Sequence, residues 1–111
     1  MINKNIKNEN GKEEIICSMI SEDGSETLQA EVTYRFKQVK KGKFAIVTFR
    51  DDFKINSDYD CAYSMLINTI PEGIYSVVIG NKPNDKNYNI IKEAAIRAGF
   101  TETRGKLIKN L

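Results

Sequence analysis

The sequence contains no histidine and no tryptophan, and it has only two cysteines and two prolines among its 111 residues. Without an imidazole the chain cannot build a Ser-His-Asp or Cys-His nucleophile pair, a histidine metal ligand, or an imidazole acid or base that works near neutral pH. Any catalysis would rest on carboxylates, tyrosine, lysine, cysteine or positioning. The sequence therefore disfavours an enzyme, and it predicts no catalytic residue, no metal site and no cofactor requirement.

The two cysteines, Cys17 and Cys61, lie far apart in apolar neighbourhoods and form no Cys-x-x-Cys motif. This spacing predicts two buried free thiols in a reducing compartment. The longest apolar runs, residues 44–49 and 74–79, are far shorter than the roughly 20 residues that a membrane-spanning helix needs. The N-terminus also lacks the apolar block of a secretion signal. We therefore expect a cytoplasmic chain with no membrane partner.

The size and composition fit one globular domain, because 41% of the residues are hydrophobic and 29% are charged. The formal net charge of +2 is too small to imply a nucleic-acid partner by itself, although local clustering of charge still could. A domain of this length can fold without disulfides or metals, and a second copy would help. A homodimer is therefore compatible with the sequence, and the partner remains open between protein and nucleic acid.

The first half of the chain shows strand patterns. Residues 1–12 are rich in Asn and Lys without an apolar period, which predicts a disordered N-terminal tail before a single domain over residues 13–111. A strand over residues 13–21 ends at Asp23-Gly24, a hairpin signal. Over residues 26–38 a strict alternation predicts a strand with one buried and one solvent face. Its predicted buried side chains are Leu28, Val32, Tyr34 and Phe36, and its predicted exposed ones are Glu31, Arg35 and Lys37.

The second half alternates helices and strands. After a buried strand over residues 44–49, an apolar helical period predicts a helix over residues 58–70, with Ser57 as its N-cap. A strand over residues 74–79 and a helix over residues 85–98 follow, and Gly99 ends this helix. Residues 101–111 predict a last strand broken near Gly105, or alternatively a basic helical tail.

The predicted fold class is α+β. A three-stranded antiparallel meander is followed by α-β-α-β, with the helices packed on one sheet in the order β-β-β-α-β-α-β.

A basic segment lies between the second and third predicted strands. It carries no acidic residue and is flanked by Tyr34, Phe36 and Phe44, and its cations are Arg35, Lys37, Lys40, Lys41 and Lys43. Such a hairpin could bind the phosphate backbone of a nucleic acid. The alternative is a solvated turn whose lysines protect a sheet edge. A second basic group, formed by Arg97, Arg104, Lys106 and Lys109, could extend the surface if the last strand lies nearby.

From about Ile15 to Leu107, the order of elements resembles the GNAT family of N-acetyltransferases without its first strand and acceptor-binding helices. The residues that carry the resemblance are Val77-Val78-Ile79-Gly80-Asn81 and, further on, Ala98-Gly99-Phe100: a strand, an Asn-bearing loop and a helix that ends in Ala-Gly-Phe. The resemblance implies a GNAT-like fold and assigns Asn81 and Asn84 as the residues that would bind an acyl-CoA cofactor.

The sequence departs from that family at its phosphate-binding turn. The family uses a Gln/Arg-x-x-Gly-x-Gly/Ala turn, whereas residues 50–57 contain no glycine and include Asp51 and Asp52. Together with Asp58 and Asp60, these carboxylates could instead form an active site, although helix capping explains them equally well. The leading interpretation is a degenerate, non-catalytic binding or accessory domain, compatible with a mobile-element origin. The alternatives are a small acyl-CoA-dependent N-acetyltransferase and a nucleic-acid-binding domain that uses the hairpin of residues 34–44.

Overall fold

The computed structural model describes residues 2–9, 12–20, 28–50 and 59–111. Over these residues the chain forms one α+β domain with two helices and a mixed sheet. The elements in chain order are β1 (Ile2–Glu9), β2 (Lys12–Ile20), β3 (Leu28–Val39), β4 (Gly42–Phe49), α1 (Tyr59–Thr69), β5 (Ile74–Ile79), α2 (Tyr88–Arg97), β6 (Thr101–Thr103) and β7 (Lys106–Asn110).

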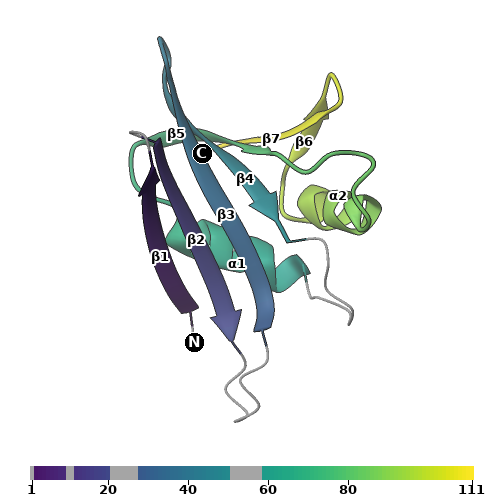
Figure 1. Cartoon of the computed structure of the whole chain (residues 1–111). Helices are drawn as coiled ribbons and strands as arrows, with labels where there is room; N and C mark the ends of the chain where they lie inside the picture. Colours follow the sequence, from purple (N-terminus) through teal and green to yellow (C-terminus); the bar gives the residue numbers. More distant parts are fainter. Residues whose placement is uncertain (1, 10–11, 21–27, 51–58) are drawn as a thin grey trace.

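The strands form one sheet in the order β1-β2-β3-β4-β5-β7-β6 (Figure 1). Within the described part of the chain, every neighbouring pair is antiparallel except β4 and β5, which are parallel. A parallel pair cannot be joined by a tight turn, so the chain crosses over through α1 between these two strands. The predicted order of elements is present from β2 to α2. The structure adds β1 before it and divides the last predicted strand into β6 and β7.

Strand β1 lies where the sequence predicted a disordered tail over residues 1–12. Residues Ile2–Glu9 pair antiparallel with β2, from Ile2 opposite Met19 to Glu9 opposite Lys12. Backbone N–H and C=O groups make this pairing, and every residue except proline carries both, whatever its side chain. An edge strand can therefore be rich in Asn and Lys and show no apolar alternation.

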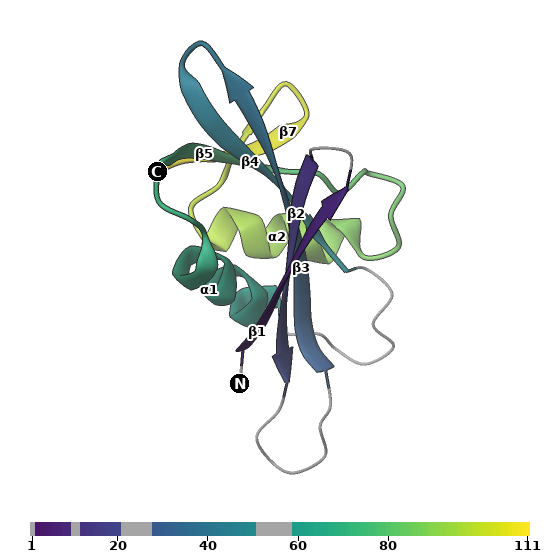
Figure 2. The ribbon, with the colours of Figure 1, turned by 60° about the vertical axis from the view of Figure 1, so that its left-hand side comes forward.

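Both helices cover the same face of the sheet, as Figures 1 and 2 show. The ring of Phe49 in β4 lies 4.4 Å, centroid to centroid, from that of Tyr63 in α1. The Tyr63 hydroxyl donates to the Ile91 carbonyl of α2 at 3.0 Å. This contact joins the two helices to each other and to the sheet, and a single hydrophobic core lies between the layers.

The predicted alternation in β3 is confirmed. Val32 and Tyr34 are fully buried, whereas Arg35 and Lys37 on the opposite face are exposed. Glu31, which was predicted to be exposed, lies on that same face but is half-buried and forms an ion pair with Arg50. Phe36 is partly buried against the core, near the end of the strand. The side chain of Leu28 lies outside the described part of the structure. The alternation predicted the two faces correctly because one face of this antiparallel strand packs on the helices while the other meets solvent.

The last eleven residues form a hairpin and not a helical tail. Strands β6 and β7 pair antiparallel, with Thr103 opposite Lys106. The two residues between them, Arg104 and Gly105, have φ angles of 51° and 75°. Positive φ at both central positions is the geometry of a type I′ turn, whose twist matches that of paired strands. The break that the sequence predicted near Gly105 is this turn.

Helix α2 begins later than predicted but ends as predicted. Asp85 accepts a hydrogen bond from the Lys82 backbone N–H at 2.8 Å, which forms a turn where the sequence predicted the first helical residue. At the other end Gly99 has a φ of +95°, and the Phe100 backbone N–H donates to the Ala95 carbonyl at 2.9 Å. This is the hydrogen bond of a Schellman end, and Phe100 is buried beside it.

Of the two cysteines, Cys17 is buried and free, as predicted, while the side chain of Cys61 is not described.

Candidate nucleic-acid interface

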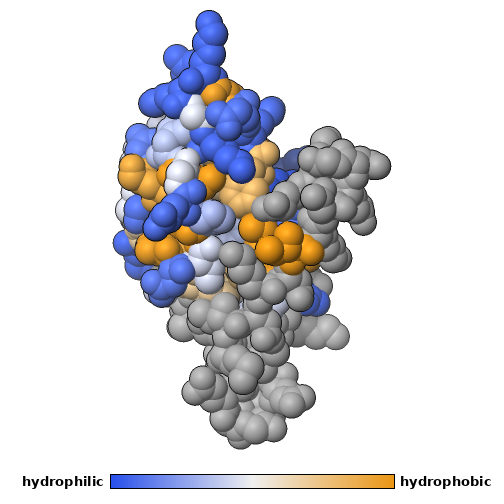
Figure 3. Space-filling view, turned by 90° about the vertical axis from the view of Figure 1, so that its left-hand side faces the viewer, coloured by the Kyte–Doolittle hydropathy of each residue, from blue (hydrophilic) through white to orange (hydrophobic). Residues whose placement is uncertain are grey.

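The β3–β4 hairpin projects beyond the helices at one end of the molecule, the top of Figures 1 and 2. Its last strand pair joins Val39 to Gly42, so Lys40 and Lys41 form the turn. Gly42 has a φ of +144°, and a Cβ at this position would lie 3.1 Å from Cδ1 of Tyr75. Glycine therefore lets the end of the hairpin lie close against the Tyr75 ring. Hydrophilic side chains dominate this projecting end in Figure 3.

All five basic residues predicted as a nucleic-acid site lie on this hairpin, and all five are exposed: Arg35, Lys37, Lys40, Lys41 and Lys43. Arg35 forms an ion pair with Glu14 of β2, with Nε 3.0 Å from the carboxylate Oε2. No ion pair joins the four lysines to a carboxylate in the described part of the chain. The hairpin therefore presents a cluster of cations that are available to an external anion.

Two of these lysines lie near aromatic rings. The Lys41 ammonium is 5.2 Å from the ring centroid of Tyr75, and the Lys43 ammonium is 5.0 Å from that of Phe36. At exposed sites such cation–π contacts contribute about 0.5–1 kcal/mol each. They favour particular positions for two side chains that would otherwise sample many rotamers. Part of the entropy cost of binding an anion is therefore met before the anion arrives.

Tyr75 is a residue of this surface that the sequence did not reveal. It belongs to β5, distant in sequence from the hairpin, and its ring meets Phe44 edge to face at 6.3 Å between centroids. Lys43 pairs with Ile74, which brings β5 beside the base of the hairpin. Only the parallel pairing of β4 and β5 puts Tyr75 there, and no local pattern could have predicted that pairing.

The second basic group is divided between two parts of the molecule. Arg104 and Lys106 belong to the β6–β7 hairpin, which points toward the same end as the β3–β4 hairpin in Figures 1 and 2. The Lys109 ammonium instead donates to the Ala98 carbonyl at 2.7 Å and caps the end of α2. Arg97 belongs to α2 itself. Two of the four predicted residues therefore lie at the end that carries the hairpin.

Asn81, predicted as a cofactor ligand, holds the backbone of the neighbouring strand. Its Oδ1 accepts from the Phe49 backbone N–H at 2.8 Å, and its Nδ2 donates to the Phe49 carbonyl at 2.8 Å. The residue is 8% exposed. Next to it, a Cβ on Gly80 would lie 2.8 Å from the Thr48 hydroxyl, which shows how closely the chain approaches β4. The side-chain amide thus extends the β4–β5 pairing by one residue.

Asn84, the other predicted cofactor ligand, is exposed in the loop between β5 and α2. The stretch of residues 50–57, which was predicted to depart from the family's phosphate-binding turn, lies outside the described residues from Asp51 onward, as do Asp58 and the side chain of Asp60. Among the described residues, no group of three or more Cys, Asp or Glu side chains is arranged to hold a metal ion.

The buried tyrosines are hydrogen-bonded within the fold. The Tyr34 hydroxyl contacts that of Thr69, and the Tyr63 hydroxyl donates to Ile91. Burial away from water raises the pKa of both phenols well above the ordinary value of 10.0. Both phenols therefore remain protonated. Tyr34 joins β3 to α1, and Tyr63 joins α1 to α2.

No family model, curated protein or solved structure matches this chain. Neither helix in the described part of the chain is long and apolar enough to cross a membrane.

Proposed function

We propose that this chain is a non-catalytic binding domain that holds the phosphate backbone of a nucleic acid on its β3–β4 hairpin. The observation that carries the proposal is the cluster of four exposed lysines, which have no ion pair with the described residues and lie at one projecting end. Lysines that contact phosphates release condensed counterions, and this release drives association at low salt. A two-stranded ribbon is also narrow enough to enter a major groove.

The sheet topology favours this function over lysines that only protect a sheet edge. Edge protection is needed where a strand has an unpaired side. Strands β3 and β4 lie inside the sheet, since β3 pairs with β2 and β4 pairs with β5. Lys40 and Lys41 lie beyond these pairings, in the turn, where there is no strand edge to protect. Lys37 and Lys43 lie on the two paired strands next to it. A ligand of opposite charge accounts better for their number.

The test is fluorescence anisotropy with labelled single- and double-stranded oligonucleotides. We expect binding at about 50 mM salt that weakens steeply toward 200 mM. Lys40→Glu combined with Lys41→Glu should weaken binding at least about ten-fold and lower the slope of log affinity against log salt by about 2.

The matched control is Lys82→Glu combined with Lys86→Glu, which makes the same change of charge at two exposed positions of another loop. This control should keep most of the affinity. No binding of any oligonucleotide at low salt, or equal losses in the two double variants, would refute the proposal.

The second candidate is an acyl-CoA-dependent N-acetyltransferase of the GNAT type. The order of elements from β2 to β7, with a helix after each of the parallel strands β4 and β5, supports a GNAT-like ancestry. We propose that the chain is a reduced derivative of that fold without the activity. In support of this, both polar atoms of the Asn81 side chain are bonded to the Phe49 backbone. These two bonds hold the amide against β4, and with the residue only 8% exposed little of the side chain remains for a cofactor.

Calorimetry with acetyl-CoA separates the two candidates. We expect a flat trace with the unmodified chain, because residues 50–57 contain no glycine to let a pyrophosphate approach the backbone amides. Saturable binding in the low micromolar range that disappears in Asn84→Ala would instead support the transferase. Asn84 is exposed, so this substitution leaves the fold intact.

A further inference from the structure

The sheet face opposite the helices is uncovered in the described part of the molecule, and Figure 1 looks onto its β1–β3 part with α1 behind. Alternation in β4 defines this open face: Ala45 and Val47 are buried toward the helices, so Ile46 points the other way. The strand register then gives a row of side chains across five strands of the open face. From β2 to β7 the members of this row are Glu14, Arg35, Ile46, Val78 and Ile108.

The middle of this row is apolar. Ile46, Val78 and Ile108 are each only half-buried, so they leave an aliphatic strip across β4, β5 and β7. Phe44 lies two residues before Ile46 on the same face, half-buried and edge to face with Tyr75. The strip and the two rings form one apolar surface next to the base of the basic hairpin.

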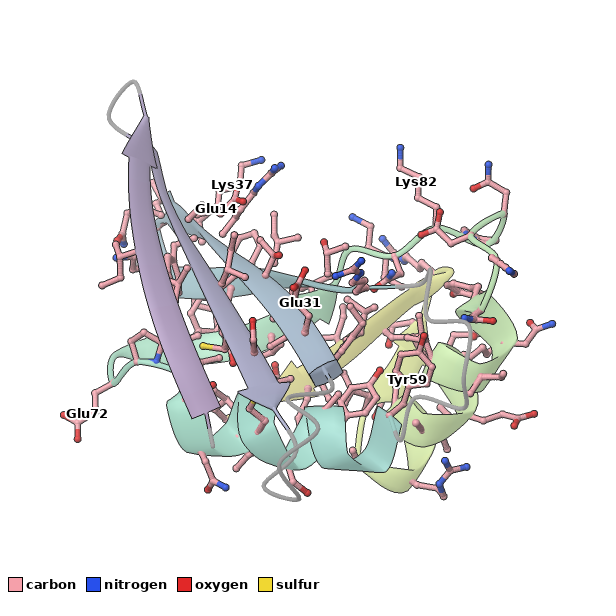
Figure 4. The ribbon with its side chains drawn as sticks, turned by 60° about the horizontal axis from the view of Figure 1, so that its bottom comes forward. Glu14, Glu31, Lys37, Tyr59, Glu72 and Lys82 are labelled. Atoms are coloured by element: carbon pink, nitrogen blue, oxygen red, sulfur yellow. The ribbon has the colours of Figure 1, made fainter. Side chains whose placement is uncertain are left out.

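Cations border this apolar surface on both sides. On the β3 side, Arg35 pairs with Ile46 and Lys37 pairs with Phe44, and both cations are exposed. Figure 4 shows Lys37 and Glu14 on the side of the sheet away from the helices. On the β7 side, Lys106 lies two residues before Ile108, on the same face and exposed. Among the side chains that the structure describes, the acidic ones on this face are Glu14 and Glu31, and each forms an ion pair with an arginine.

We propose that this open face binds single-stranded nucleic acid, with bases against Phe44, Tyr75 and the aliphatic strip, and phosphates at Lys37 and Lys106. The inference rests on the proposed function and names its ligand more narrowly. Unstacked bases have apolar faces that can lie on a sheet between flanking cations, and stacking on aromatic side chains tolerates any sequence. A duplex keeps those base faces inside its own stack, so it can meet the lysines but not the apolar strip.

The width of the surface agrees with such a ligand. Strands β3, β4, β5 and β7 are successive neighbours, and three spacings of about 4.8 Å separate the first from the last. The surface therefore spans about 14 Å, which suits the two or three bases that a sheet of this size can present to single-stranded RNA. The cations at the two borders of the surface also suit a single strand, because its phosphates lie to the outside of its bases.

The test uses tryptophan fluorescence, because the chain has no tryptophan and Phe44→Trp would introduce a unique reporter. Oligo(dT) should quench this fluorescence at low salt and bind at least about ten-fold more tightly than a duplex of the same length. In otherwise unmodified chain, Phe44→Leu should weaken oligo(dT) binding about five-fold or more and leave duplex binding unchanged. Tyr88→Leu, at a half-buried tyrosine on α2, is the matched control and should bind as the unmodified chain does.

A second variant does not depend on how well Phe44→Leu folds. Lys37→Glu combined with Lys106→Glu changes only exposed positions at the two borders of the face, and it should weaken oligo(dT) binding more than duplex binding. Circular dichroism of each variant establishes that the fold is kept.

The failures of the two proposals are distinguishable. Loss of all binding in Lys40→Glu, Lys41→Glu, with equal affinity for single strand and duplex in the unmodified chain, would overturn the inference and leave the hairpin function standing. Quenching by oligo(dT) that survives this hairpin variant would support the open face and refute the hairpin. A fluorescence blue shift on anionic phospholipid vesicles with no response to oligonucleotides would overturn both.

Discussion

At the scale of single residues, the structure uses its few buried polar side chains to join elements. Asn81 extends the β4–β5 pairing through two hydrogen bonds to Phe49, and Tyr63 joins α1 to α2 through the Ile91 carbonyl. No buried side-chain N or O atom among the described residues lacks a hydrogen-bond partner. Buried polar groups that lose a partner are costly, so such residues are sensitive positions.

Substitution of Asn81 tests this role. Asn81→Ala leaves both the N–H and the C=O of Phe49 without their partner, and we expect the free energy of unfolding to fall by about 2–4 kcal/mol. Urea denaturation followed by circular dichroism measures the change. Asn84→Ala is the control, because Asn84 is exposed and its loss should change stability by less than about 0.5 kcal/mol. Equal stability of the two variants would show that Asn81 does not hold the strand.

At the scale of elements, helices and strands begin and end where the sequence predicted when a glycine or proline restricts the backbone there. The strand predicted over residues 74–79 matches β5 (Ile74–Ile79), which follows the Pro71 and Gly73 that end α1. Gly99 ends α2 because a residue with a φ of +95° is strained unless it is glycine. The start of α2 was less predictable, since an Asp can cap a helix or form a turn before it, and Asp85 does the latter.

The same scale shows why the basic site was only partly predictable. A run of lysines around a glycine predicts an exposed hairpin, and the structure places all five cations there. The aromatic partner Tyr75 and the cation Lys106 come from β5 and β7, which the sequence could not assign to neighbouring positions. The Asn81 prediction came from the GNAT resemblance, and its hydrogen bonds to Phe49 became visible only with β4 and β5 in register.

At the scale of the whole molecule, one core between the sheet and the two helices carries the stability, and two buried tyrosines belong to it. Tyr34 in β3 and Tyr63 in α1 are among the largest fully buried side chains described. Their hydroxyls reach α1 and α2 respectively. Ionisation of either phenol would put an unpaired charge into this core, which predicts a definite response to alkaline pH.

We expect stability to decrease as the pH rises above about 10. Burial raises the pKa of Tyr34 and Tyr63 above the value of 10.0 that they have when exposed. Above that pH the unfolded chain releases protons that the folded chain keeps, so each tyrosine lowers the free energy of unfolding by up to about 1.4 kcal/mol per pH unit. Below pH 10 this contribution to stability is fully present.

Urea denaturation at pH 8, 10 and 11 measures this decline. Tyr63→Phe should lower stability at pH 8, because the bond to Ile91 is lost, and should show a shallower decline above pH 10. Tyr75→Phe, at the half-buried Tyr75, is the control and should keep the full slope. A free energy of unfolding that does not change between pH 8 and 11 would contradict the role of the buried phenols.

The sequence by itself determined the α+β class, the alternating faces of β3, the C-terminal end of α2, both ends of β5, and the clustering of lysines at one hairpin. These features depend on neighbouring residues, through side-chain periodicity and the steric limits of glycine and proline. Tertiary structure decided that β1 forms, that β4 and β5 run parallel, and that Ile46, Val78 and Ile108 share one row. Neighbouring strands are joined by backbone hydrogen bonds that every residue except proline can make, so side-chain patterns carry little information about which strands pair.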